Sequence, residues 1–234
     1  MSDMTLFQRA RSAEQREVRR RAILDTAAAM LAEMTVAEVT LNELSRRVGL
    51  AKSNVLRYFE SREAVLLDLL GSEWQEWLAA LAGELDTAVD PSAPVAARGD
   101  QLAAVLATSL NNRPVLCDLV SAQAAVLERN VSPQVAATYK RATIAGLMDL
   151  GVLLRGHLGE LSDHDAPRLA AAAMVTVGAL WPQCQPSAAM LTAYEADPSL
   201  AALRLDFEPA LREFLEVFIS GTLARARTAS AADR

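Results

Sequence analysis

Four polar side chains between residues 52 and 57 are the best placed to do chemistry: Lys52, Ser53, Asn54 and Arg57. Lysine and arginine form paired hydrogen bonds with guanine, and asparagine does the same with adenine, so this set can identify base edges in the major groove of DNA. An ordinary solvated helix face carries the same residue types. The choice between these two interpretations depends on the elements that position the cluster.

A short helix is expected just before the cluster. Thr40 and Glu43 have the spacing of a capping box, in which the hydroxyl and the carboxylate each accept from a backbone N–H. Gly49 then ends the helix, because glycine adopts the left-handed conformation that closes many helices. The residues expected on the buried face of this helix are Leu41, Leu44 and Val48.

A second short helix, over about Lys52–Tyr58, follows the glycine. It buries Val55 and Phe59 one turn apart and therefore turns the polar cluster outward. Ser45 is small at the point where the two helices must cross. A small residue, a glycine four positions later and an aliphatic residue six positions after that are the spacing of a helix-turn-helix.

This stretch resembles the tetracycline-repressor (TetR) family of bacterial regulators, over about Arg20–Leu70. The trailing motif YFESREAVL is its most specific part. Ser45, Ser53 and Arg62 replace the usual alanine, glycine and lysine of the family, which are tolerable exchanges. The matching or equivalent positions are Thr40, Leu44, Gly49, Leu50, Val55, Tyr58, Phe59, Ser61, Glu63 and Val65.

The resemblance implies a set of DNA contacts. Arg57 and Asn54 are expected to read bases, while Thr40, Tyr58 and Arg62 hold phosphates. Ala51 replaces a common capping residue, and Leu56 replaces a tyrosine that often contacts a phosphate. The full set of expected DNA-binding residues is Thr40, Lys52, Ser53, Asn54, Arg57, Tyr58 and Arg62.

The whole chain is expected to be all-α, because apolar residues recur at helical spacing and no run alternates with period two. We expect a DNA-binding domain at residues 1–66 and a helical effector-binding and dimerisation domain at residues 67–234. The helix beginning near Ser61 is taken as the only covalent bridge between them, and Asp86–Asp100 has the composition of a linker. About nine helices are expected, over roughly Ala13–Glu33, 41–48, Lys52–Tyr58, from Ser61, Gln101–Leu110, from Pro114, Ser132–Leu158, Asp163–Pro182 and Asp206–Arg227.

The resemblance also implies a cavity for a small molecule among the middle helices. Large side chains with a few polar groups suit such a cavity, although single residues of these types are more often part of a core. The candidate ligand-binding residues are Trp77, Gln123, Tyr139, Thr143, Met174 and Trp181.

A homodimer is expected through the helices at about Asp163–Pro182 and Asp206–Arg227. One short recognition helix reads too few bases alone, so two copies must bind together. The alternative is that these helices pack only within their own chain. The candidate interface residues are Leu211, Leu215 and Phe218.

Charge is divided unevenly along the chain. Residues 1–70 hold eleven Lys and Arg against ten Asp and Glu, a net charge of +1, whereas residues 71–234 hold 12 against 19, a net charge of −7. A local basic face, rather than the net charge of −6, is what a phosphate backbone meets. The N-terminal arginines form either a minor-groove arm or a solvated helix: Arg9, Arg11, Arg16, Arg19, Arg20 and Arg21.

Several other classes of protein are disfavoured. The sequence holds no nucleophile motif, phosphate loop or dinucleotide glycine pattern, so neither an enzyme nor a cofactor is expected. No cluster has metal-ligand spacing except Asp163–Asp165, which is more typical of a helix cap than of zinc. Cys117 and Cys184 are expected to be reduced thiols. No membrane span or secretion signal is present, so a cytoplasmic protein is expected.

The sequence therefore predicts a ligand-responsive repressor. It would bind a palindromic operator in double-stranded DNA as a dimer and be released by a small apolar or amphipathic effector. A DNA-binding regulator without a small ligand, controlled by a protein partner, is the alternative, and an enzyme on a helical scaffold is a third hypothesis.

Overall fold

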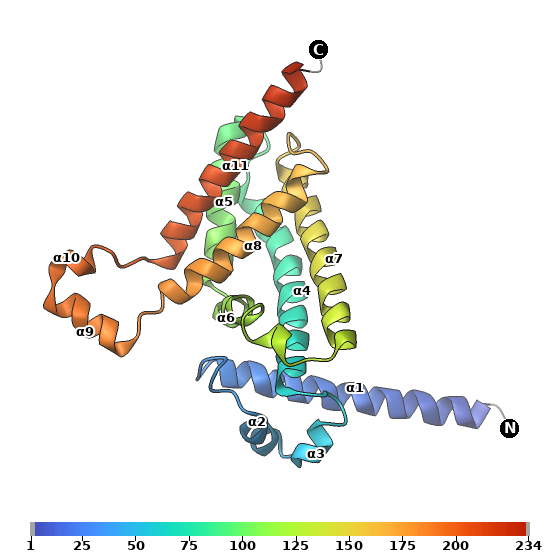
Figure 1. Cartoon of the computed structure of the whole chain (residues 1–234). Coiled ribbons are helices and arrows are strands. Elements are labelled where there is room, and N and C mark those ends of the chain that lie inside the picture. Colours follow the sequence, from blue (N-terminus) through green and yellow to red (C-terminus); the bar gives the residue numbers. More distant parts are fainter. Residues whose placement is uncertain (1–2, 233–234) are drawn as a thin grey trace. The chain divides into compact units, whose positions relative to one another are not determined.

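The computed structural model describes the backbone of residues 3–232 and the side chains of residues 14–226. All regular structure in that part of the chain is helical, as the sequence predicts (Figure 1). The chain forms two compact units. The first comprises Met1–Leu70 with Gln123–Tyr139, and the second comprises Gly71–Ala122 with Lys140–Arg234.

The chain passes between these units at three points, after Leu70, after Ala122 and after Tyr139. The expectation of a single covalent bridge is therefore wrong, because a segment distant in sequence packs with the N-terminal helices. Within the first unit, the backbone N–H of Ser132 donates to the Glu60 carboxylate at 2.6 Å. Sequence periodicity cannot reveal such a long-range contact.

The first unit is built around the C-terminal half of its long first helix. Ile23, Ala27 and Met30 are fully buried on one stripe of that helix, as are Leu44 and Val55 on the two helices that follow. The elements of this unit are α1 (Asp3–Leu31), α2 (Leu41–Val48), α3 (Lys52–Val55), the start of α4 (Arg62–Ala88), the 3-10 helix Leu127–Arg129 and the start of α7 (Pro133–His157).

A glycine turn joins α2 to α3. Gly49 has φ of 71°, in the left-handed region, and its N–H donates to the Arg46 carbonyl at 3.3 Å. Ser45 is buried, and its hydroxyl donates to the Leu41 carbonyl at 2.6 Å. The backbone N–H of Leu50 donates to the Ser45 carbonyl at 3.0 Å. The chain thus reverses tightly without leaving a buried polar group unpaired, as a helix-turn-helix requires.

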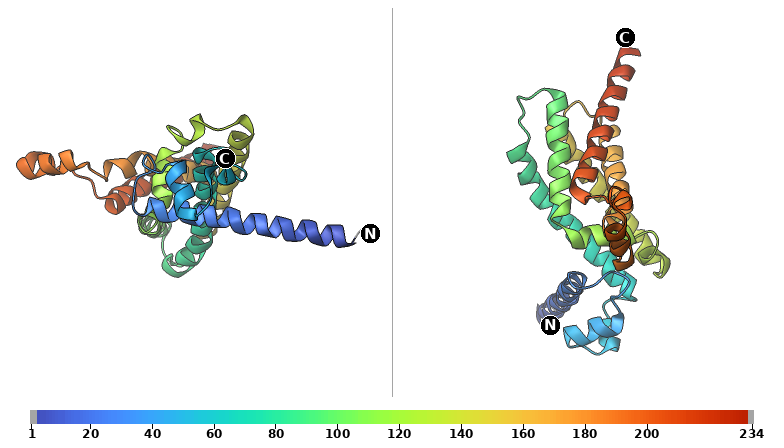
Figure 2. Two further views of the ribbon diagram at one scale, coloured as in Figure 1. Left: turned by 90° about the horizontal axis from the view of Figure 1, so that it is seen from below. Right: turned by 90° about the vertical axis from the view of Figure 1, so that its left-hand side faces the viewer.

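In the second unit, α11 (Phe207–Ala232) packs along α5 (Val95–Asn111) and α8 (Asp165–Gln183) (Figure 2). Helix α6 (Pro114–Ala122) packs on α8. Leu102 and Leu106 of α5 and Leu211, Leu215 and Ile219 of α11 are buried in this core. Two short helices, α9 (Ala188–Ala196) and α10 (Pro198–Ala201), lie between α8 and α11.

The described residues contain eleven α-helices where about nine are expected from sequence. The additional ones, α9 and α10, lie in a stretch whose prolines favour a connector. Ser187 and Asp197 cap them through side-chain oxygens, which accept from Met190 N at 3.3 Å and Ser199 N at 2.9 Å. Pro198 lies in the first turn of α10, where the backbone N–H that proline lacks has no partner within the helix. The linker expected at Asp86–Asp100 is shorter than expected, because α4 ends at Ala88 and α5 begins at Val95.

The described helices include none that is both long enough and apolar enough to span a bilayer. Within the same residues, no group of three or more histidine, cysteine and acidic side chains gathers as metal ligands do. In the Asp163–Asp165 stretch, the Asp165 backbone N–H donates to the Ser162 hydroxyl at 3.0 Å. Cys117 is buried and Cys184 half-buried, and both are free thiols.

Candidate nucleic-acid interface

The polar cluster of α3 faces outward over two buried side chains. Val55 and Phe59 are buried, whereas Lys52, Ser53 and Asn54 are exposed, as is Arg57 just beyond the helix. The apolar pair fixes the element against its own unit. All four polar side chains are therefore available to a ligand, and two of them, Lys52 and Arg57, carry positive charge.

The recognition element is shorter and more tightly wound than the helix expected at Lys52–Tyr58. Regular α-helix ends at Val55, and the N–H groups of Arg57 and Tyr58 donate to carbonyls three residues back, at 3.2 and 2.9 Å. Such bonds narrow the last turn to a 3-10 geometry. Ala51 provides no side-chain cap at the other end, in accord with its apolar type.

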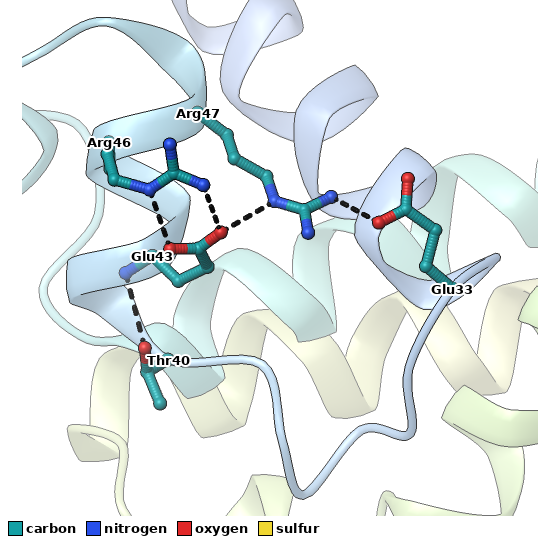
Figure 3. A network of polar contacts seen from close by, with 5 residues as sticks. All are labelled: Glu33, Thr40, Glu43, Arg46 and Arg47. Carbon is teal, nitrogen blue, oxygen red and sulfur yellow. Dashed lines mark hydrogen bonds and ion pairs between the residues drawn. The ribbon is translucent and has the colours of Figure 1, made fainter.

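Helix α2 is held by a network centred on Glu43 (Figure 3). The hydroxyl of Thr40 accepts from the Glu43 backbone N–H at 3.2 Å, so the cap forms. The Glu43 carboxylate accepts from Arg46 at 2.6 and 2.8 Å and from Arg47 at 2.9 Å. Arg47 also donates to Glu33, near the end of α1, at 2.7 Å. The second bond of a capping box, from the Thr40 backbone N–H to the Glu43 carboxylate, does not form, because the carboxylate accepts from Arg46 and Arg47 instead.

This network has an electrostatic consequence. Hydrogen bonds from Arg46 and Arg47 lower the pKa of Glu43 to about 2. The carboxylate thus stays ionised and offsets part of the positive charge on α2. Because Arg47 bridges Glu43 and Glu33, the network also ties α2 to the residues that follow α1.

Arg62 lies at the start of α4 and has its partners inside the protein. Its Nη1 donates to the Val39 carbonyl at 2.9 Å and lies 3.4 Å from the carbonyls of Val36 and Ala37. Its Nη2 lies 3.1 Å from the Glu63 carboxylate. The guanidinium therefore braces the loop before α2. These contacts favour a positioning role for Arg62, and the phosphate contact expected from sequence stays a prediction.

The aromatic residues after α3 rest against arginines of α1. The Arg16 guanidinium lies 5.9 Å from the centre of the Tyr58 ring, and that of Arg20 lies 4.8 Å from the Phe59 ring. Arg20 also pairs with Asp68 at 2.6 Å. Of the N-terminal arginines, these two support the first unit. The side chains of Arg9 and Arg11 lie outside the described residues.

The candidate ligand-binding residues fall in both units. Gln123 and Tyr139 belong to the first, where the tyrosine hydroxyl donates to the glutamine side chain. Trp77 and Trp181 are buried in the second and donate to Ser109 at 3.1 Å and to Asp118 at 2.6 Å. Met174 is buried and Thr143 half-buried, also in the second unit.

Asp118 is a half-buried carboxylate that is not among the site residues predicted from sequence. Burial raises its pKa, while the hydrogen bond from Trp181 acts in the opposite direction. The Trp181 ring also meets Phe207 edge-on, with centres 4.8 Å apart, which joins the ends of α8 and α11. The sequence signal for this site was a single aspartate in the otherwise apolar helix α6.

The candidate interface residues on α11 differ in burial. Leu211 and Leu215 are buried within their own chain and have no surface left for a partner. Phe218 is half-buried, and Phe214 and Val217 beside it are exposed. The apolar surface that α11 can offer a second copy is therefore the Phe214 face, not the leucine face.

Comparisons with known proteins agree with this geometry. Residues 23–69 match the family described as bacterial regulatory proteins, tetR family. Residues 71–226 match the family described as tetracyclin repressor-like, C-terminal domain. No curated protein sequence matches the chain.

Solved structures of the same fold include three with low sequence identity. A regulator assigned to the TetR family from Mesorhizobium loti MAFF303099 is 14% identical with a TM-score of 0.54, covering 89% of this chain and 96% of its own. FadR from Bacillus subtilis, in complex with stearoyl-CoA, is 13% identical with a TM-score of 0.52, covering 86% and 98%. A TetR regulator from Rhodococcus sp. RHA1 is 14% identical with a TM-score of 0.51, covering 88% and 96%.

Proposed function

The chain belongs to the TetR family of bacterial regulatory proteins, and from that premise we propose that it is a cytoplasmic, ligand-responsive repressor without enzymatic activity. It binds a palindromic operator as a homodimer and leaves the DNA when a small apolar or amphipathic effector binds. The DNA-binding domain is residues 1–66 and the effector-binding and dimerisation domain residues 67–234. One observation carries the proposal: exposed base-reading side chains stand on a short element fixed by Val55 and Phe59.

The chemistry of that element fits the major groove. Arg57 and Asn54 have the donors and acceptors that distinguish guanine and adenine, and Lys52 and Ser53 extend the same exposed face. Thr40 and Tyr58, at the ends of the motif, are proposed to contact phosphates. These contacts fix position on the duplex without carrying sequence information.

A dimer follows from the size of the element and from the second unit. Helix α3 with its following turn is too short to specify a site alone, whereas two copies read half-sites about one helical turn apart. Val175 on α8 and Phe214 and Val217 on α11 are large, apolar and exposed. Large apolar side chains exposed on two helices that pack together are expected to be covered by a partner.

An apolar or amphipathic effector suits the second unit, whose three tryptophans lie on helices rich in alanine and leucine. FadR from Bacillus subtilis, which shares the fold, was solved with stearoyl-CoA. To act as a switch, the effector must bind the DNA-free form more tightly than the DNA-bound form. Weakening operator binding a hundredfold requires about 2.7 kcal/mol of coupling, within the usual allosteric range.

Selection of bound DNA from a random pool tests the DNA half of the proposal. We expect a palindrome, and we expect Arg57→Ala to cost about 1–3 kcal/mol per half-site while relaxing the preference at one position. Arg129→Ala, which removes an exposed arginine elsewhere in the first unit, is the matched control. Unchanged affinity and preference in Arg57→Ala would show that the recognition element is assigned wrongly.

Tryptophan fluorescence tests the effector half. Apolar and amphipathic compounds that bind saturably are expected to weaken operator affinity in proportion to their occupancy. Saturable binding that leaves operator affinity unchanged would refute the ligand switch and favour control by a protein partner.

A further inference from the structure

The segment between α8 and α11 is an apolar arm without a core of its own. Residues 185–206, here called the arm, contain α9 and α10, in which no residue is buried. Figure 1 shows the arm extending away from α5, α8 and α11. Its base is closed by the contact of Trp181 with Phe207. Five large side chains of the arm are 38–69% exposed: Met190, Leu191, Leu200, Leu203 and Leu205.

Helix α7 carries a second unpartnered apolar surface in the same unit. Ile144, Met148 and Val152 recur every fourth residue and are 59%, 53% and 70% exposed. These three residues are called the α7 stripe. The opposite side of the helix is packed, since a Cβ on Gly146 would strike Trp74 of α4, and Leu150 and Leu154 are buried. The stripe therefore faces away from its own unit.

We propose that the arm of one copy packs against the α7 stripe of a second copy, so that each chain of the dimer embraces the other. The inference rests on the proposed homodimer and specifies which surfaces complete it. Val175 on α8 and Phe214 and Val217 on α11, the helices proposed to form the dimer, are exposed as well.

The arrangement of the second unit favours contact between copies over contact within a chain. In Figure 1 the arm and α7 lie on opposite sides of α8, so an arm cannot cover the stripe of its own chain. When two copies pair face to face through α8 and α11, a two-fold axis parallel to α11 exchanges the arm side and the α7 side of the unit. The arm of one copy then lies on the same side of the pair as α7 of its partner.

Charge is complementary at the edges of the two surfaces. Arg141 is exposed one turn before the α7 stripe, and Glu195 is exposed at the end of α9. Opposite charges at the rim of an apolar contact fix its register and disfavour a wrong partner. Two arms facing each other would instead bring like charges together at Glu195.

Cross-linking of two differently tagged, co-expressed chains tests the proposal. One chain carries Leu203→Cys and the other Met148→Cys, both with Cys184→Ser to remove the half-buried native thiol. A short bismaleimide is expected to join the two tags at least tenfold more than when Asp149→Cys, exposed on α7 beside the stripe, replaces Met148→Cys. Linkage of Leu203→Cys chains to each other would overturn the proposal in favour of arm-to-arm pairing.

A second measurement uses the dimer equilibrium. Leu203→Asp is expected to raise the dimer dissociation constant at least tenfold, which corresponds to about 1.4 kcal/mol. Ala202→Asp adds the same charge to the same exposed segment and is expected to change it much less. A wild-type monomer in sedimentation would refute the dimer itself. A stable dimer with neither cross-link nor Leu203→Asp effect would refute only the arm contact.

Discussion

Replacing Arg62 by alanine separates two roles for this residue, bracing a loop and holding a phosphate. Its Nη1 makes one hydrogen bond of normal length, 2.9 Å to the Val39 carbonyl, and two contacts of 3.4 Å that exceed the usual range. A hydrogen bond from a charged donor contributes about 1.5–3 kcal/mol. Counting only the short bond, we expect Arg62→Ala to lower the free energy of unfolding by that amount.

Thermal unfolding gives the first readout. For a chain of 150–250 residues each kcal/mol moves the melting temperature by about 2–4 °C, so the expected decrease is on the order of 3–12 °C. Arg62→Lys keeps the positive charge but loses the planar fork that reaches several carbonyls. It is expected to lie close to the alanine variant in stability.

The salt dependence of DNA binding gives the second readout. Losing one phosphate contact reduces the slope of log affinity against log salt concentration by about 0.9. We expect the slope to stay unchanged in Arg62→Ala, measured well below its melting temperature. An unchanged melting temperature together with a slope reduced by about 0.9 would refute the bracing role.

Three further outcomes are expected. Phe214→Glu places a charge on the exposed α11 face and should give monomers at micromolar concentration in sedimentation, whereas Glu213→Gln should not; dimers of Phe214→Glu would exclude this face. Because the pKa of Glu43 is lowered to about 2, its stabilising contribution is fully present above about pH 4.5 and is lost as the pH falls towards 2; the melting temperatures of wild type and Glu43→Gln should therefore differ at pH 7 and converge over that range. Leu56 is exposed beside Arg57 and can contact a thymine methyl, so Leu56→Ala should relax a thymine preference in the selected DNA, and an unchanged preference would place it outside the groove.

The helix-turn-helix was predictable from sequence because its determinants are local. Gly49 adopts the left-handed conformation and Thr40 caps α2, and both act within one turn of helix. The buried positions of Val55 and Phe59 follow from helical spacing alone. These features need no knowledge of where the rest of the chain lies.

The partners of charged residues were not predictable in this way. Arg62 reaches carbonyls 23–26 residues earlier, and Arg47 reaches Glu33, 14 residues earlier. An arginine followed by a glutamate looks the same in sequence whether it faces solvent, a phosphate or a loop. Only the packing of α1, α2 and α4 decides which of these it meets.

The dimer face of α11 shows a third kind of limit. Leu211 and Leu215 form one apolar stripe, and Phe214 and Val217 form another beside it. A helix that is apolar on two adjacent faces satisfies the pattern for an internal contact and for an external one. Helical periodicity identifies both stripes. It cannot determine which stripe packs against α5 of the same chain, because the position of α5 is not encoded in the periodicity of α11.

The uneven charge of the chain bears on how two copies can meet on DNA. Residues 71–234 carry a net charge of −7, so this part is repelled by the phosphate backbone and by its own second copy. Pairing of the second units must then come from apolar surface. Among the residues whose side chains are described, eleven of the thirteen exposed large hydrophobic side chains lie in the second unit. Salt should therefore act in opposite directions on the two associations. It weakens DNA binding by reducing the gain from counterion release, and it favours pairing by screening the repulsion between copies.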